Sequence, residues 1–290
     1  MKILEWYRAY NGQVFTGFSG GKDSTVLLDL ARQVCPDIPA VYVDTGLEYP
    51  ELRDFVKTKD NVIWLLPRYP YTQILEKYGY PVISKDISDV ISGARKGQPY
   101  RLARLNGESL DKNGKKSIYN CEKYKYLLDA PFAISARCCY YMKKAPLNKF
   151  ERQSGRHPIT GVLACESKLR EQSYLKFGCN GYERRRPLSQ PLAFWREEDI
   201  LRYLRMTGIP YTPIYGDIGE VKKRNGALTL KTTGVSRSGC MYCMYGVHLE
   251  HEPNRFQLME KTHPQQYHYC IHELGLGAVL DYIGVPYSCR

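Results

Sequence analysis

The chain has 290 residues, of which 43% are hydrophobic and 25% are charged, a composition typical of a globular protein with one sizeable core. That balance excludes a disordered, collagen-like or coiled-coil chain. No apolar run reaches the roughly 20 residues that a bilayer span needs. Residues 1–8 contain no apolar signal segment, so we expect a cytoplasmic protein with no membrane partner.

Two further counts restrict the chemistry. Lys and Arg number 42 against 30 Asp and Glu, and the formal net charge of +12 favours polyanionic partners such as nucleotides or nucleic acids. A basic surface that serves solubility alone is the alternative. Ten cysteines in a reducing compartment favour metal binding or redox chemistry over a disulfide framework.

The first part of the chain alternates between two kinds of predicted element. Apolar spacing predicts helices at 3–10, 25–32 and 49–57, and β-branched or aromatic runs predict strands at 13–18, 38–43 and 62–66. This alternation predicts an α/β fold with a parallel sheet, whose ligand binds at the carboxyl ends of the strands.

The pattern changes near residue 71. From there to about 145, helix-like segments flank a stretch rich in tyrosine and basic residues, which we predict to be a helical basic insertion. Its basic residues are Arg95, Lys96, Arg101, Arg104, Lys112, Lys115, Lys116, Lys123 and Lys125. A strand at 157–163, a loop at 186–195 and a helix opening at 197–199 return to the core pattern.

These elements predict two parts of the chain. Residues 1–216 form the core domain, which contains the insertion at about 71–145 and closes with the segment 209–216. Residues 217–290 form a C-terminal segment that carries a cysteine pair and a short helical tail.

The loop between the first predicted strand and the following helix reads Ser19-Gly-Gly-Lys-Asp-Ser24. Two glycines let backbone N–H groups approach a ligand, and a lysine and two hydroxyls stand at a helix N-terminus, which favours anions. The loop is not the Walker A pattern, because Asp23 follows Lys22 where that pattern needs Ser or Thr. We expect it to hold a pyrophosphate; a tight turn with a surface lysine is the alternative.

Several motifs in this order resemble the PP-loop, or N-type, ATP pyrophosphatases, in the branch with phosphoadenosine-phosphosulfate reductases and the small subunit of ATP sulfurylase. The matching stretches are 18–24, 43–50, 169–173, 191–195 with Asp199, and 209–211. Members of that family split ATP between the α and β phosphates, leave AMP on a substrate oxygen and release pyrophosphate. The resemblance covers most of the chain and implies a parallel-sheet PP-loop domain, similar to adenine nucleotide alpha hydrolases.

The resemblance also implies the ligands ATP and Mg²⁺ and a set of residues to bind them. The β and γ phosphates would lie on Ser19, Gly20, Gly21, Lys22, Asp23 and Ser24. Asp44 and Thr45 would place the nucleotide or metal, Gly161 would border the nucleotide, and Arg170 would contact a phosphate or sulfate. The implied catalytic residues are Lys22, Asp23, Asp44 and Arg170. A helix cap at Asp44 and a surface ion pair at Arg170 are the alternatives.

Four cysteines form two pairs about a hundred residues apart, the tandem Cys138-Cys139 and the C-x-x-C pair Cys240 and Cys243. Adjacent cysteines suit a four-iron cubane better than one small tetrahedral zinc ion. The arrangement resembles the [4Fe-4S] site of bacterial and plant-type adenylylsulfate reductases. A zinc site and a redox pair at Cys240 and Cys243 stay open as alternatives.

Other residues near these motifs are candidates for supporting roles. Lys143, Lys144 and Arg237 would offset the negative charge of a thiolate-ligated cluster, or are solvated surface residues. Of the remaining cysteines, most of which we expect to be buried, Cys165 would face the nucleotide pocket and Cys289 lies on a terminal tail.

Two features separate the chain from the reductase pattern. The reductases attack sulfate sulfur with a cysteine in a C-terminal Glu-Cys-Gly-Leu-His motif, which residues 284–290 do not contain, and they carry an altered phosphate loop. The leading hypothesis is therefore an iron–sulfur ATP pyrophosphatase that adenylates an acceptor oxygen so that sulfur can replace it.

Two other functions stay open. The first is an adenylylsulfate or phosphoadenosine-phosphosulfate reductase, and the second is a noncatalytic nucleotide- or nucleic-acid-binding protein. We expect an adenine nucleotide as the ligand. A nucleic acid, a sulfur-carrier protein and a second copy of the chain are open as further partners.

Overall fold

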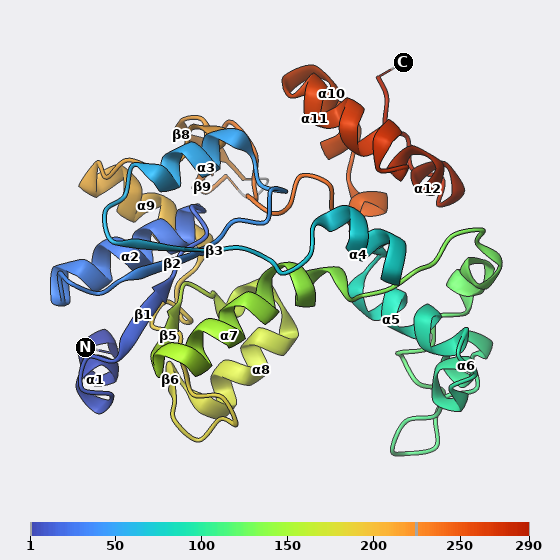
Figure 1. Cartoon of the computed structure of the whole chain (residues 1–290), viewed down its shortest axis with the longest axis horizontal. Helices are drawn as coiled ribbons and strands as arrows, with labels where there is room; N and C mark the ends of the chain where they lie inside the picture. The colour runs from blue at the N-terminus through green and yellow to red at the C-terminus, as the bar shows by residue number, and fades with distance from the viewer. Residues whose placement is uncertain (1, 224–225, 290) are drawn as a thin grey trace. The chain divides into compact units, whose positions relative to one another are not determined.

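The computed structural model describes residues 2–223 and 226–289, and the chain divides into two compact units (Figure 1). The first unit comprises Met1–Leu66 and Ala145–Cys240. The second comprises Pro67–Lys144, which includes most of the basic segment, together with Met241–Arg290. In the described ranges, none of the helices combines the length and apolar character that crossing a membrane would require.

The first unit is built on a six-stranded sheet with the order β3-β2-β1-β5-β7-β6. Its strands are β1 (Val14–Gly17), β2 (Ala40–Val43), β3 (Val62–Leu65), β5 (His157–Thr160), β6 (Asn180–Gly181) and β7 (Leu188–Ser189). Every pairing is parallel except that of β6 with β7. The predicted α/β fold with a parallel sheet is therefore confirmed, and β1 lies at its centre.

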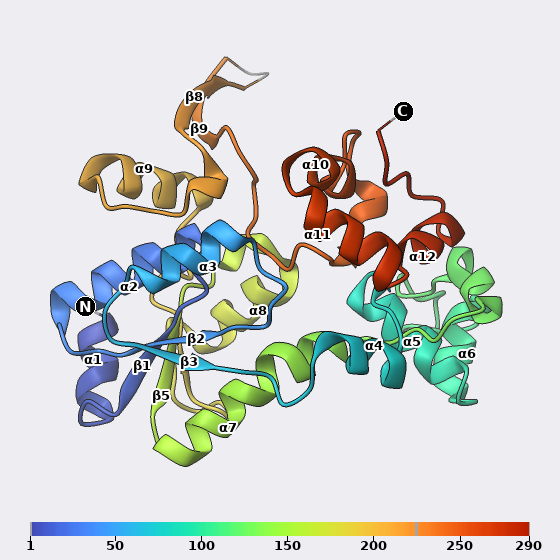
Figure 2. The same ribbon diagram turned by 45° about the horizontal axis from the view of Figure 1, so that its top comes forward.

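Helices cover both faces of this sheet. They are α1 (Lys2–Ala9), α2 (Lys22–Val34), α3 (Pro50–Lys57), α7 (Ala145–Ser154), α8 (Lys168–Phe177) and α9 (Glu197–Thr207). Successive side chains of a strand point to opposite faces of the sheet. Val14 therefore packs with α2, while the ring of Phe15 contacts that of Phe150 in α7 edge-to-face, with 5.2 Å between the ring centroids. Figure 2 shows α2 and α3 on one side of the sheet and α7 on the other.

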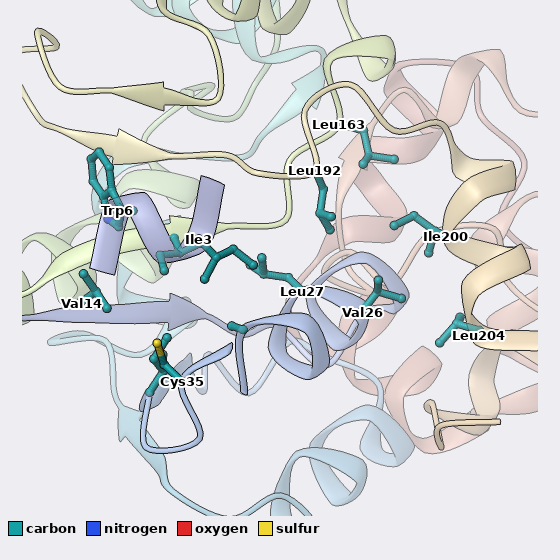
Figure 3. Close-up of a cluster of buried hydrophobic side chains, with 13 residues drawn as sticks. Ile3, Trp6, Val14, Val26, Leu27, Cys35, Leu163, Leu192, Ile200 and Leu204 are labelled. Carbon is teal, nitrogen blue, oxygen red and sulfur yellow. The ribbon is translucent and has the colours of Figure 1, made fainter. Parts of the chain in front are cut away.

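The main core lies between the central strands and α1, α2 and α9 (Figure 3). Val26 and Leu27 of α2 are fully buried there against Ile200 and Leu204 of α9. Each side chain of this size stabilises the fold by about 1.5–3 kcal/mol when it is removed from water. This packing fixes the N-terminus of α2 at the carboxyl end of β1.

The first unit also contains a two-stranded antiparallel hairpin, β8 (Ile218–Lys222) and β9 (Leu228–Thr232), after the 3₁₀ turn η4 (Pro213–Tyr215). Another 3₁₀ turn, η3 (Ala164–Glu166), follows β5. The chain then runs from β9 through residues 233–240 to the end of the unit.

The second unit is mainly helical. Its helices are α4 (Tyr71–Tyr78), α5 (Lys85–Ala94), α6 (Pro99–Asn106), α10 (Arg255–Thr262), α11 (Pro264–His268) and α12 (Leu276–Tyr282). Its short helical turns are η1 (Glu122–Asp129), η2 (Tyr140–Lys144), η5 (Val247–Leu249) and η6 (Tyr269–Glu273). A parallel pair, β4 (Val82–Ile83) with β10 (Met244–Tyr245), joins its two chain segments.

Candidate functional site

The phosphate loop follows β1 and ends where α2 begins at Lys22. Gly20 has a φ of +74°, and a Cβ atom there would lie 2.8 Å from Leu52 Cδ2, so both the backbone conformation and the space require glycine. The Ser24 and Thr25 hydroxyls donate to the carbonyl of Gly21 at 2.9 and 3.0 Å. These bonds hold the loop in shape without a ligand.

A second glycine, Gly161, lies directly against the phosphate loop. Gly161 follows β5, and a Cβ atom there would lie 2.9 Å from the carbonyl oxygen of Asp23 and 3.3 Å from the amide nitrogen of Ser24. A side chain at Gly161 would therefore displace the loop. The structure thus places Gly161 directly against the residues that the resemblance assigns to the phosphates.

The loop lysine is buried, with 5% of its surface exposed. Its ammonium group donates to the carbonyl of Ser236 at 3.0 Å and pairs with Glu197 at 3.1 Å. The Tyr215 hydroxyl accepts from the amide of Lys22 at 3.2 Å and donates to Ser238 Oγ at 2.7 Å. Residues 236–238 therefore lie against the phosphate loop, although they are more than 200 residues away in the sequence.

Charged side chains gather beside this loop. Burial raises the pKa of Asp23, and Lys22, Arg170 and Arg237 oppose that rise. Burial and the neighbouring Arg237 lower the pKa of Arg170, while Asp23 and Cys165 oppose that change. Asp23 Oδ1 is buried and has no hydrogen-bond partner in the part of the chain that the structure describes. An unpartnered carboxylate oxygen of this kind can accept a cation or a ligand proton.

Two of these cations are already paired with carboxylates. Arg170 forms an ion pair with Glu166, four residues earlier in the chain, and Lys22 pairs with Glu197, whose side chain is 61% exposed. An incoming phosphate can replace the exposed Glu197 carboxylate as the partner of the buried Lys22 ammonium, so that the buried charge stays paired. The loop is therefore suited to an anionic ligand.

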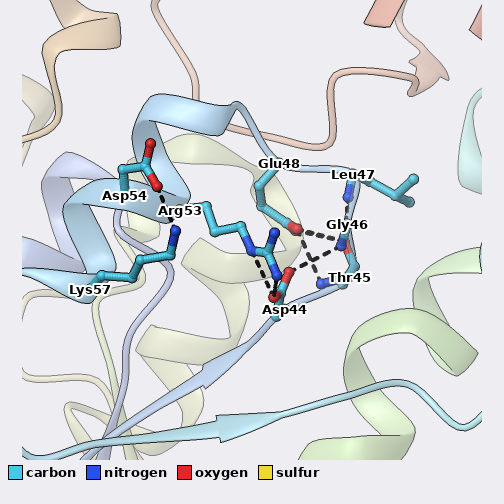
Figure 4. Close-up of polar contacts among 8 residues, drawn as sticks. All are labelled: Asp44, Thr45, Gly46, Leu47, Glu48, Arg53, Asp54 and Lys57. Atoms are coloured by element: carbon cyan, nitrogen blue, oxygen red, sulfur yellow. Dashed lines mark hydrogen bonds and ion pairs between the residues drawn. The ribbon is translucent and has the colours of Figure 1, made fainter. Parts of the chain in front are cut away.

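The polar side chains of the turn after β2 form hydrogen bonds with one another, with the turn's backbone and with Arg53 of α3 (Figure 4). Asp44, which is 5% exposed, accepts from Arg53 Nε at 2.8 Å and from the amide of Gly46 at 3.2 Å. The Thr45 hydroxyl donates to Glu48 at 2.7 Å. The helix cap considered for Asp44 is absent, since Tyr49 is the N-cap residue of α3. Roles of Asp44 and Thr45 toward a nucleotide stay predictions.

In the second unit, three of the four paired cysteines influence one another. A hydrogen bond with Cys138 lowers the pKa of Cys139 to about 6 against the effect of burial, and Lys85, Lys143 and Lys144 lower it further. Burial raises the pKa of Cys243, and the proximity of Cys139 adds to that rise. The pKa of Tyr245 is raised by burial and by Cys139, Cys138 and Cys243.

These thiols do not form a ligand set in the structure as it stands. Within residues 2–223 and 226–289, no three Cys, His, Asp or Glu side chains are arranged to hold a metal ion. Cys240 is the last residue of the first unit, whereas Cys138, Cys139 and Cys243 belong to the second. The predicted four-cysteine site therefore stays a prediction.

The other cysteines differ in exposure. Cys165 is exposed, and its thiol lies 3.6 Å from the carbonyl of Trp195. The Cys289 thiol lies 3.6 Å from the carbonyl of Gln257, and its amide donates to Glu260 at 2.7 Å. Burial raises the pKa of Cys270 to about 12. Cys165 is thus an exposed thiol in the unit that contains the phosphate loop.

Sequence reasoning missed part of the loop's surroundings. Tyr215, Ser236 and Ser238 contact the loop, but nothing in their spacing links them to it. Arg237, which we expected to offset the charge of a cluster or to be a solvated surface residue, is exposed, and its charge acts on Asp23 and Arg170. The one available signal was local, a Ser-Arg-Ser-Gly sequence of the kind that favours anion contacts, just before Cys240.

Comparison with known proteins places these features in context. Residues 13–63 and 70–244 match the family model described as "Phosphoadenosine phosphosulfate reductase domain". The chain is 27% identical over 222 residues to an adenosine 5′-phosphosulfate reductase of Staphylococcus epidermidis, covering 74% of this chain and 70% of the relative. It is 28% identical over 222 residues to the enzyme of the same name from Geobacillus kaustophilus, covering 74% and 73%.

A solved structure gives a weaker match. The crystal structure of phosphoadenylyl-sulfate reductase from Candida auris, a phosphate complex, superposes with a TM-score of 0.43 at 14% sequence identity. The match covers 75% of this chain and 85% of that one.

Proposed function

Because this chain belongs to the phosphoadenosine phosphosulfate reductase domain family, we propose that it is an enzyme that reduces an adenosine 5′-phosphosulfate-type nucleotide bound at its phosphate loop. Two relatives that match 74% of the chain carry the name of that reductase, which supports this reading over our leading hypothesis from sequence. The resemblance to ATP pyrophosphatases within the same superfamily remains valid for the fold.

The observation that supports the proposal is that cationic side chains and an exposed thiol occur in the same unit as the phosphate loop. The Lys22 ammonium, the Arg170 guanidinium and the α2 N-terminus offer charge and donors for the phosphate and the sulfonate. Cys165 is exposed and close enough to Arg170 to raise its pKa. The thiolate is the form of a cysteine that attacks sulfur.

In the proposed reaction, the Cys165 thiolate attacks the sulfonate sulfur of the nucleotide. A sulfur–sulfur bond forms, the bond from sulfur to the phosphate oxygen breaks, and AMP leaves with that oxygen and the bond's electron pair. A second thiolate, from an added dithiol or a protein thiol, then attacks the Cys165 sulfur. Sulfite leaves and a disulfide remains, so the thiols are oxidised by two electrons and the sulfur is reduced by two.

We also propose that Cys138, Cys139, Cys240 and Cys243 hold the [4Fe-4S] cluster that the resemblance implies. The donor set of the second unit is compatible with it, since Cys139 forms a hydrogen bond with Cys138 and its charge acts on Cys243, and iron binds thiolates. Bound there, the cluster would supply a fixed charge and tie chain segments together. The reaction steps above use the chain's own thiols.

One specific observation favours a second candidate function, the ATP-dependent adenylation of an acceptor. The loop keeps the Ser19-to-Ser24 sequence of ATP-using members of the superfamily, and the unpartnered Asp23 Oδ1 is suited to hold Mg²⁺. In that reaction an acceptor oxygen attacks the α phosphate of ATP, and pyrophosphate leaves.

The two candidates predict different products. The protein is incubated anaerobically with adenosine 5′-phosphosulfate and dithiothreitol, or with ATP, Mg²⁺ and candidate acceptors, and sulfite, AMP and pyrophosphate are measured. Sulfite and AMP in equal amounts are expected from the first mixture. Pyrophosphate from the second mixture, with no sulfite from the first, would reject the reductase in favour of adenylation.

Single-residue variants test whether Lys22 and Cys165 take part in the reaction. Lys22→Ala removes a charged contact worth about 1.5–3 kcal/mol, so turnover should fall about 10- to 150-fold, whereas Lys57→Ala on the exposed surface of α3 should have no effect. Cys165→Ser should stop sulfite release, and Cys289→Ser should not. Wild-type sulfite release by Cys165→Ser would exclude Cys165 as the attacking thiol.

A further inference from the structure

Half of the chain's excess positive charge lies in one short stretch of the second unit. Residues 95–126 contain nine Lys or Arg and three Asp or Glu, a net charge of +6 out of the +12 of the whole chain. None of these residues has a role in the reaction proposed for the first unit. The structure separates the basic side chains of this stretch into two classes.

The arginines of residues 95–126 form internal contacts that stabilise the fold. Arg95 donates to the carbonyls of four residues, Leu127, Leu128, Ala130 and Phe132. Arg101 pairs with Asp89. Arg104, which is 4% exposed, pairs with Asp86 and donates to the carbonyl of Tyr119 at 2.8 Å. These three charges are therefore committed to internal contacts.

All six lysines of the stretch are exposed, and three of them lie on one loop, residues 107–121, which we call the lysine loop. Of these three, Lys116 pairs with Glu122 at 2.8 Å. Asp111 Oδ1 accepts from the amides of Asn113 and Lys115 at 2.8 and 2.9 Å and shapes the tip. The amide of Ser117 donates to the carbonyl of Ser109 at 2.8 Å. Lys112 and Lys115 are exposed, and neither has an ion-pair partner among the residues whose positions are described.

Large apolar side chains accompany these lysines. Ile118 is 90% exposed, Tyr119 65% and Leu110 63%. The backbone of Tyr119 is held on both sides, because its amide donates to Ser117 Oγ at 3.2 Å and its carbonyl accepts from Arg104. An ordered backbone that displays several large apolar groups together is the mark of an interaction surface.

We propose that the lysine loop binds single-stranded nucleic acid, with Lys112 and Lys115 on phosphates and Tyr119 stacked on a base. Phosphates and unstacked bases match exposed lysines followed a few residues later by an exposed aromatic ring, whereas an acidic protein surface offers the charge without the flat apolar partner. A duplex keeps its bases stacked and away from Tyr119. This binding does not depend on the reaction proposed for the first unit.

The test uses the full chain and a fluorescein-labelled 20-nucleotide single-stranded oligonucleotide, with anisotropy measured from 50 to 200 mM salt. Lys112→Gln/Lys115→Gln should reduce the slope of log K against log salt by about 1.4, since each phosphate contact on a single strand contributes about 0.7. The matched control is Lys149→Gln/Lys261→Gln, which removes two exposed charges outside the loop and should leave the slope unchanged.

Tyr119→Ser tests the stacking contact separately. Its affinity should fall by at least about fivefold with the slope unchanged, because stacking on one base is worth about 1–3 kcal/mol. An unlabelled duplex of the same length and a polyglutamate of equal charge should both compete poorly. An unchanged slope in the lysine variant, wild-type affinity in Tyr119→Ser, or full competition by polyglutamate would each overturn the proposal.

Discussion

The two units use basic side chains for opposite purposes. In the first unit, the Lys22 ammonium and the Arg170 guanidinium are paired with carboxylates that a ligand can replace, and Arg237 is an exposed neighbour. In the second, Arg95 and Arg104 are saturated by carbonyls and a carboxylate of the fold. A basic side chain with many internal hydrogen-bond partners is structural, and one with few or replaceable partners is available to bind a ligand. The number of charges in a segment does not make this distinction.

The cysteines divide in the same way. Cys165 of the first unit is exposed, as a reacting thiol must be, and its charge affects the pKa of Arg170. In the second unit, Cys138 lowers the pKa of Cys139, and Cys139 raises the pKa of Cys243. The contrast predicts that one unit uses a thiol for chemistry and the other uses several for ligation.

The largest expected effect concerns ligation. Cys139→Ser should lose the bound iron and its visible absorption, because a thiolate ligand is removed from the cluster. Iron and sulfide per chain, measured anaerobically, report the loss. Cys289→Ser, a half-buried cysteine of the same unit, should retain both. Full iron content in Cys139→Ser would exclude the tandem pair as a joint ligand set.

A pair of arginine variants tests the contrast between the units directly. Arg104→Met removes charged hydrogen bonds to Asp86 and to the Tyr119 carbonyl, so the free energy of unfolding should fall by about 1.5–3 kcal/mol. Arg237→Met should change it by less than about 0.5 kcal/mol, as is usual at an exposed position, while nucleotide affinity falls.

Denaturant unfolding and nucleotide titration of both arginine variants provide the measurement. The expected pattern is a stability loss without an affinity loss in Arg104→Met, and the reverse in Arg237→Met. The same pattern in both variants would show that the units do not differ in this respect.

The smallest expected effect is a gain in stability. Burial raises the pKa of Asp23 above 3.8, so the folded state holds the proton more tightly than the unfolded state does. The stability that follows from this is present at low pH and is lost as the pH rises through the folded-state pKa. Asp23→Asn should therefore be more stable than the parent protein at pH 7 and equal to it below pH 3.8.

Thermal unfolding from pH 3 to pH 8 measures this difference, and nucleotide turnover should fall in the same variant. A pH-independent difference between Asp23→Asn and the parent would show that the buried carboxylate is compensated at neutral pH. Asp54→Asn on the exposed surface of α3, where the side chain is 69% exposed, provides the control.

Local patterns were enough to predict part of the first unit. They did not predict α7, α8, β6 or the β8/β9 hairpin, and the loop predicted at 186–195 contains the short strand β7. Helices near 3–10 and 49–57 and strands near 13–18 and 38–43 appear within a few residues of their predicted bounds, because each carries its own apolar period. The predicted strand at 157–163 ends earlier, at Thr160, since Gly161 packs against the phosphate loop. The position of the loop itself follows from the strand before it and the helix after it.

What the sequence by itself determined is therefore local: the α/β alternation, the phosphate loop, and the pairing of cysteines by spacing. The tertiary structure alone decided that residues 236–238 lie against Lys22, that residues 67–144 and 241–290 form one compact unit, and that the arginines and lysines of 95–126 have different roles. Periodicity and turn chemistry act between near neighbours in the chain. Contacts between residues two hundred positions apart depend on how buried faces pack, and no single segment carries that information.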